Sequence, residues 1–157
     1  MNRRTTLVLL AALLAAPAAG AQAVRLKIAT IAPDGSQWIN KLSAAADEIV
    51  TRTNGRVSLR FYPGGVMGSD QAVLRKIRIG QLQGGVVLAG SLASSEPNME
   101  IYNLPLLFRS YEEVDAVRAK MDARLIGGLE EKGFVSFGFI GTGFTYLLST
   151  KPTRSFD

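Results

Sequence analysis

Two hydrophobic periodicities alternate along this chain and predict an α/β fold. Apolar and polar residues alternate at every second position over 24–31 and 56–62, which is typical of half-buried strands. Over 36–53 and 69–79, apolar residues instead recur three or four positions apart, as they do on one face of a helix. Because helix, strand and helix follow one another so closely, we expect an open sheet with flanking helices.

Turn residues mark the ends of these segments. Asn54 and Gly55 are typical of a helix end, because glycine adopts the left-handed conformation without a Cβ clash. The run 63–65, Pro-Gly-Gly, ends the second strand, and Ser69 or Asp70 can cap the helix that follows. Gly80 is expected to end that helix.

The rest of the chain contains one more helix and up to three strands. Residues 84–89 are apolar throughout, which predicts a strand at the centre of a sheet, and 90–99 has the composition of a loop. Ser110 and Glu113 form a capping-box pattern, and Gly133 ends the helix behind it. Further strands are expected at 134–140 and 146–150. The helix has one apolar face, made of Val114, Val117, Met121, Leu125 and Leu129.

Trp38, the sole tryptophan, has two interpretations. In the helix at 36–53 the expected apolar stripe is Trp38, Leu42, Ala45 and Ile49, which favours packing in the core. Its position directly after the first strand–helix loop also allows it to line a cleft.

The N-terminus predicts export. Arg3 and Arg4 precede a short apolar run at 7–14, and A-x-A cleavage patterns end at Ala21 and Ala23. Residues 1–23 are therefore interpreted as a cleaved signal peptide, with an uncleaved anchor as the alternative. Cleavage would lower the formal net charge from +5 to +3.

Composition excludes several classes of function. The remaining basic residues form no dense stripe, so a nucleic-acid partner is not expected. The chain has no cysteine and no histidine, which removes disulfides, thiolate chemistry and the commonest general base.

Four patterns that suggest chemistry also have plainer explanations. The glycines at 138–143 lack the last glycine of G-x-G-x-x-G, and 63–65 lacks the G-K-[ST] of a phosphate loop. Glu96 and Glu100 fit solvated loop acids better than a catalytic pair. The basic cluster at 75–78 fits a hydrated helix face.

Five sequence motifs, in order, resemble one family of receptors. They are I-A-T-I-A-P-D-G-S at 28–36, T-x-G-R-V at 53–57 with Y-P-G-G-x-x-G at 62–68, R-x-G-Q-L at 78–82, L-P-L-L-F at 104–108, and G-F with K-P at 133–134 and 151–152. This order resembles the solute-binding subunits of tripartite ATP-independent periplasmic (TRAP) transporters, the DctP-like proteins.

The resemblance implies a periplasmic-binding-protein-like open sheet that forms the first lobe of a two-lobe, ligand-closing fold. Residues 24–141 would form the N-terminal lobe, and 142–157 would be the segment that crosses into a second lobe. The sequence is therefore interpreted as truncated before that lobe. A compact one-lobe protein is the competing view. The protein would be periplasmic and without a cofactor. It would bind a small organic acid and deliver it to the membrane permease subunits of an ion-driven transporter. The alternative is a secreted α/β enzyme or sensor lobe.

Ligands of open α/β sheets bind beyond the carboxyl ends of the strands, which selects the loops at 32–37, 63–69 and 89–94. Two of these loops lead into helix N-termini, which favour an anion. An arginine common in the family's crossing segment is absent here, where Thr145 follows Phe144, so the substrate stays open. The expected ligand-binding residues are Pro33, Asp34, Gln37, Trp38, Ser91, Thr145 and Tyr146.

Overall fold

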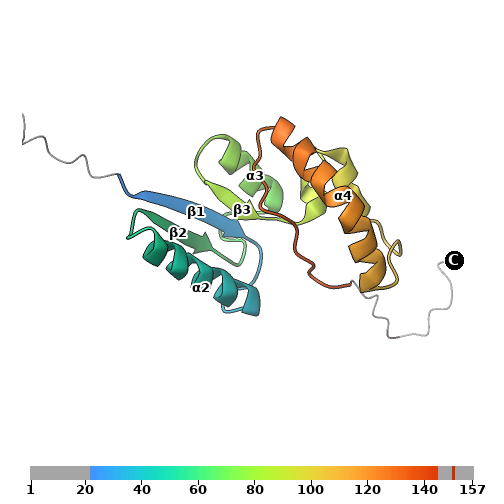
Figure 1. Ribbon diagram of the computed structural model, residues 1–157, viewed down its shortest axis with the longest axis horizontal. Coiled ribbons are helices and arrows are strands. Elements are labelled where there is room, and N and C mark those ends of the chain that lie inside the picture. The colour runs from blue at the N-terminus through green and yellow to red at the C-terminus, as the bar shows by residue number, and fades with distance from the viewer. Residues whose placement is uncertain (1–21, 145–149, 151–157) are drawn as a thin grey trace, which may run out of the picture. The chain divides into compact units, whose positions relative to one another are not determined.

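The computed structural model describes residues 22–144 and Thr150. The chain divides into two compact units, Met1–Ser91 and Leu92–Asp157. The first unit contains the sheet, and the second contains the longest helix (Figure 1).

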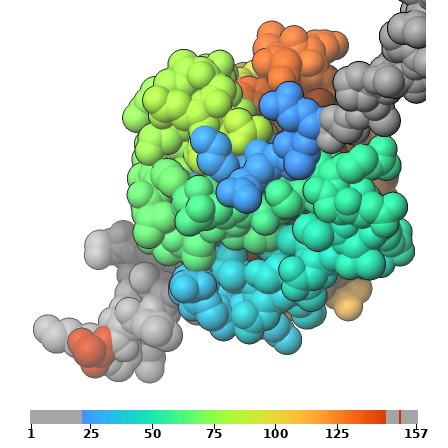
Figure 2. Space-filling model, turned by 90° about the vertical axis from the view of Figure 1, so that its left-hand side faces the viewer, coloured from blue at the N-terminus to red at the C-terminus, as the bar shows by residue number. Residues whose placement is uncertain are grey.

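The sheet of the first unit is parallel. Its strands are β1 (Val24–Thr30), β2 (Val57–Tyr62) and β3 (Gly84–Val86), in the order β2-β1-β3. In Figure 2 the start of β1, in blue, reaches the surface between the green residues around α3 and the teal residues of the α2–β2 turn. The prediction that 84–89 forms a central strand is wrong. Among the described residues, β3 is only three residues long and lies at the edge of the sheet. Its apolar character comes from packing under α3.

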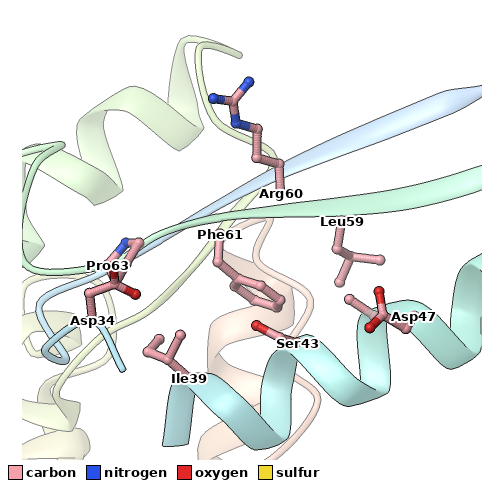
Figure 3. A pocket seen from close by; sticks show the side chains of 9 residues that line it. Asp34, Ile39, Ser43, Asp47, Leu59, Arg60, Phe61 and Pro63 are labelled. Carbon is pink, nitrogen blue, oxygen red and sulfur yellow. The ribbon is translucent and has the colours of Figure 1, made fainter. Parts of the chain in front are cut away.

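Helices cover the two faces of this sheet. α2 (Gln37–Arg52) packs on β2, and α3 (Asp70–Arg78) packs on β3 and β1. Strand alternation assigns the faces: Leu59 and Phe61 point toward α2, whereas Arg60 points away from it (Figure 3). The predicted N-cap of α2 is confirmed, because the Ser36 hydroxyl accepts a hydrogen bond from the Ile39 N–H at 3.4 Å.

The core of the first unit lies between α3 and the sheet. Ala29, Val73 and Leu82 are almost fully buried there. Gly85 makes the close approach possible: a Cβ added to it would lie 2.7 Å from Val73 Cγ1 and 3.3 Å from the carbonyl oxygen of Ala29. A side chain at this position would therefore push the helix off the sheet.

The predicted apolar stripe of α2 is half right: Leu42 and Ile49 are half-buried, but the other two positions are each displaced by one residue. The buried residues are Ile39 and Ala46, whereas Trp38 is 41% exposed and Ala45 is exposed. The core interpretation of Trp38 is therefore wrong. In α2, Ile39 rather than Trp38 faces β2, so the neighbouring indole lies outside the contact between the helix and the sheet.

The second unit is built on α4 (Tyr111–Glu131), preceded by the 3-10 helix η2 (Pro97–Tyr102). A shorter 3-10 helix, η1 (Ala89–Leu92), lies where the first unit ends, so the expected loop at 90–99 contains two short helical turns. Leu125 and Leu129 are the buried residues of α4. No helix of the described residues is long and apolar enough to cross a membrane.

Both ends of α4 follow the sequence prediction. The Ser110 hydroxyl accepts from the Glu113 N–H at 3.3 Å, and the Glu113 carboxylate accepts from the N–H of Arg109, one residue before the cap. Gly133, with φ of +82°, ends the helix.

The strand expected at 134–140 does not form. This segment has no sheet neighbour among the described residues, and Phe137 is fully exposed. Instead, Arg118 of α4 donates a hydrogen bond to the carbonyl of Phe139 at 2.9 Å. The second predicted strand, 146–150, lies almost wholly outside the described residues.

Two adjacent glycines of β3 test the close packing of α3. We expect Gly85→Ala to lower the free energy of unfolding by about 1–3 kcal/mol, because the stiff Val73 side chain and the Ala29 carbonyl cannot both move. Gly84→Ala is the control, since its Cβ meets only the flexible tip of Ile28, at 2.8 Å. Urea denaturation of both variants measures the difference, and equal losses would contradict the packing argument.

Candidate functional site

Hydrogen bonds join two loops at the carboxyl ends of the parallel strands. After β1, the carbonyl of Ala32 accepts from the N–H of Gly64 at 2.8 Å, and the carbonyl of Thr30 accepts from the N–H of Gly65 at 3.1 Å. Gly64 and Gly65 both have positive φ, at 66° and 69°. Glycine therefore allows the loop after β2 to turn its N–H groups toward the loop after β1.

The start of α3 holds the loop after β3. Asp70 is 6% exposed, and its Oδ2 accepts from the Leu88 N–H at 2.9 Å and from the Ser91 hydroxyl at 3.0 Å. Gln71 Nε2 donates to the carbonyl of Ser91 at 2.9 Å. Two consecutive residues of α3 thus fix both the side chain and the backbone of Ser91.

The loop between β1 and α2 is ordered by its own polar groups. Asp34 Oδ1 accepts from the Gly35 N–H at 3.0 Å, and Asn40 Nδ2 donates to the carbonyl of Gly35 at 3.3 Å. The Ser36 N–H donates to the Pro33 carbonyl at 3.2 Å. These bonds fix the chain direction just before Trp38.

The structure places five of the seven predicted binding residues. Four of them, Pro33, Asp34, Gln37 and Trp38, lie in one exposed loop and the first turn of α2. Ser91 lies in η1, beyond the carboxyl end of β3. Thr145 and Tyr146 lie outside the described residues.

Two hollows among the described residues of the first unit lie elsewhere. One, of about 310 Å³, runs between α2 and β2 and is lined by Ile39, Ser43 and Phe61, with Asp34 at one end (Figure 3). The other, of about 320 Å³, lies on the opposite face beside Lys27, Tyr62 and Lys76. Of the five predicted binding residues that the structure describes, Asp34 alone lines either of them.

Sequence reasoning missed the roles of Asp70, Gln71 and Lys76. Asp70 was expected only as a possible helix cap, and its partners are 18 and 21 residues away, beyond the reach of a local pattern. Lys76 is half-buried, and its Nζ donates to the Met67 carbonyl at 2.8 Å, so this lysine is not part of a purely hydrated face. The one local signal for this role was the position of Asp70, an acidic residue in the first turn of α3.

The second unit has a polar cluster of its own. The Tyr102 hydroxyl donates to Asp122 Oδ1 at 2.5 Å, and Arg118 Nε donates to Asp122 Oδ2 at 3.0 Å. Burial of Tyr102, and then its hydrogen bond to Asp122, raises the pKa of the phenol above the ordinary value of 10.0. Since Arg118 also holds the Phe139 carbonyl, the cluster anchors the segment after α4. Among the described residues, no group of three His, Cys, Asp or Glu side chains could hold a metal ion.

The sequence profile of the bacterial extracellular solute-binding proteins of family 7, DctP, matches residues 28–157. The chain belongs to this family. The predicted resemblance to TRAP solute-binding proteins and the predicted fold class are thereby confirmed.

Individual relatives agree with the family match. The C4-dicarboxylate-binding periplasmic protein DctP of Rhodobacter capsulatus is 30% identical over 128 residues, which cover 78% of this chain and 37% of that protein. A TRAP periplasmic solute-binding protein of Ochrobactrum anthropi superposes with a TM-score of 0.66 at 27% identity, covering 74% of this chain and 37% of the other. A TRAP protein of Xanthobacter autotrophicus with bound β-D-galacturonate has a TM-score of 0.66 at 23% identity, covering 73% of this chain and 39% of the other, and shows the fold alone. The chain thus spans a little over a third of the length of these relatives.

Alkaline titration tests the Tyr102 cluster. Because the folded pKa lies above the unfolded value, the neutral phenol stabilises the fold below pH 10.0, and this contribution is lost as the pH rises further. We expect phenolate absorbance to show a late phase, at a pH above 10.0, that belongs to Tyr102. Tyr102→Phe should remove the late phase, and Tyr111→Phe, at an exposed position, should keep it. A late phase that survives in Tyr102→Phe would contradict the assignment.

Proposed function

We propose that this chain is the ligand-binding N-terminal lobe of an extracytoplasmic receptor that captures a small organic acid. The observation that carries the proposal is the carboxyl edge of the parallel sheet in the first unit. There Gly64, Gly65 and Asp70 fix the loops that follow three adjacent strands. Ligands of open α/β sheets bind at such an edge.

The proposed near wall of the site consists of exposed or half-buried residues on these loops. Trp38 is 41% exposed at the start of α2, where an indole can stack on a ligand, and Ser91 offers a hydroxyl beyond β3. Pro33, Asp34 and Gln37 surround the entrance to α2. Thr145 and Tyr146 complete the proposed set.

Family membership supports binding rather than catalysis, because the relatives are solute-binding receptors. Solved relatives hold D-galacturonate, pyroglutamic acid and D-erythronate. We propose that the complete receptor closes a second lobe over such an acid and passes it to membrane permease subunits. In this scheme the second lobe supplies the cation that holds the carboxylate, as a bidentate arginine would.

Binding is tested on the receptor expressed from the complete reading frame. Isothermal titration against succinate, L-malate, pyroglutamate, D-galacturonate, D-glucuronate and D-galactonate should show saturable binding of at least one acid, and uncharged galactose should give none. Trp38 fluorescence should change on binding, and Trp38→Phe should abolish that signal while heat is still released. Residues 1–157 alone should bind at least 100-fold more weakly, because closure and the carboxylate cation would be absent. Equal affinity of this piece, or no acid bound by the receptor, would refute the proposal.

Export is a separate proposal that rests on the N-terminal pattern and on the periplasmic setting of the family. N-terminal sequencing of the protein from the periplasmic fraction should give a chain that begins after Ala21 or Ala23. A replacement of Arg3 and Arg4 by glutamate should reduce the exported fraction. A product that retains Met1 in the cytoplasm would contradict it.

A further inference from the structure

The buried carboxylate of Asp70 determines how the hydroxyl of Ser91 can bond to a ligand. Asp70 Oδ2 already accepts the Leu88 N–H at 2.9 Å, so it is an acceptor in this arrangement. The Ser91 hydroxyl therefore donates its single proton to the same oxygen, at 3.0 Å. A hydroxyl has one proton and two lone pairs, so Ser91 is left with acceptor capacity only.

The surroundings keep the Ser91 hydroxyl in this orientation. Gln71 holds the Ser91 carbonyl at 2.9 Å, which fixes the backbone from which the hydroxyl projects. Asp70 is 6% exposed, and its other oxygen, Oδ1, has no hydrogen-bond donor among the described residues. The carboxylate is thus shielded from water, and its hydrogen bond to Ser91 is strengthened by the low local dielectric.

From this geometry we infer that the receptor proposed above selects a hydroxylated organic acid. Ser91 accepts a hydrogen bond from a ligand hydroxyl, and Asp70 is the positioning residue that commits the Ser91 proton. A carboxylate has only acceptor oxygens and cannot bond to Ser91 in this state. The negative charge behind Ser91 also disfavours an anionic group there. The ligand therefore binds with its hydroxyl end toward Ser91 and its carboxylate away from it.

Deoxyfluoro analogues test this polarity in the complete receptor. The probes are D-galacturonate, D-glucuronate and D-galactonate, with the singly deoxyfluorinated forms of whichever binds; fluorine replaces the hydroxyl in size but cannot donate. One position should bind about threefold to tenfold more weakly after fluorination, the worth of one neutral hydrogen bond.

Asp70→Ala removes the acceptor that commits the Ser91 proton. The Leu88 N–H and the Ser91 hydroxyl bond to the same oxygen, Oδ2, so Asp70→Asn can keep both bonds with its amide oxygen and should preserve the fluorination penalty. Asp70→Ala frees the hydroxyl to donate to the ligand, so the penalty at the sensitive position should fall to less than twofold, while penalties at the other positions stay as in the wild type. Ser91→Ala should also abolish this penalty, and it carries the test if Asp70→Ala does not fold, as judged by near-ultraviolet circular dichroism.

Gln71→Leu is the matched control. It removes the bond to the Ser91 carbonyl but leaves the bond between Asp70 and the hydroxyl. It should weaken the parent acid and its fluorinated form by the same factor, so that the penalty is preserved. A merely structural role of Asp70 would give this same pattern in Asp70→Ala, and would overturn the inference.

The outcomes separate the two proposals. Binding of succinate in preference to every hydroxylated acid, or a fluorination penalty that persists in Ser91→Ala, overturns the inference while the receptor function stands. If no acid binds at all, the receptor function fails and the inference fails with it.

Discussion

The close contact of α3 with the sheet is the constraint on which the first unit depends. Val73 packs directly over Gly85, and this contact joins Ala29 and Leu82 in the core. Because the helix lies so close, its first residue is brought within hydrogen-bond distance of the loop after β3. The packing of the core and the position of Ser91 are therefore consequences of the same missing side chain.

The carboxyl edge of the sheet is a series of short bonds between consecutive loops. Backbone groups of Gly64 and Gly65 join the first loop to the second, and the side chain of Asp70 joins the start of α3 to the third loop. Each bond restricts one loop relative to the strand beside it. A site built on such bonds is pre-organised, which lowers the entropy lost when a ligand binds.

The sequence predicts the parts of the fold that depend on local chemistry. The cap at Ser36, the helix end at Gly133 and the strands β1 and β2 follow from side chains within four residues of each other. The errors depend on distant partners. Trp38 and Ile39 fit a helical stripe about equally well, and only the position of β2 decides which one is buried. The strand pattern at 134–140 needs a sheet neighbour, and among the described residues α4 provides Arg118 instead. The reach of Asp70 to Ser91 has no local signature at all.

The charges at the carboxyl edge bear on how a ligand would be oriented. The loops at 31–36, 63–69 and 87–91 contain no lysine or arginine, and Asp34 and Asp70 lie in or beside them. The N-terminus of α2 has its Ile39 N–H taken by Ser36, and the buried carboxylate of Asp70 stands at the N-terminus of α3. An anion would therefore find little to neutralise it on this side, whereas hydroxyl groups would find acceptors. If this edge is one wall of the site, the cation that binds the ligand carboxylate must come from residues outside these three loops, so the two walls would recognise opposite ends of one molecule.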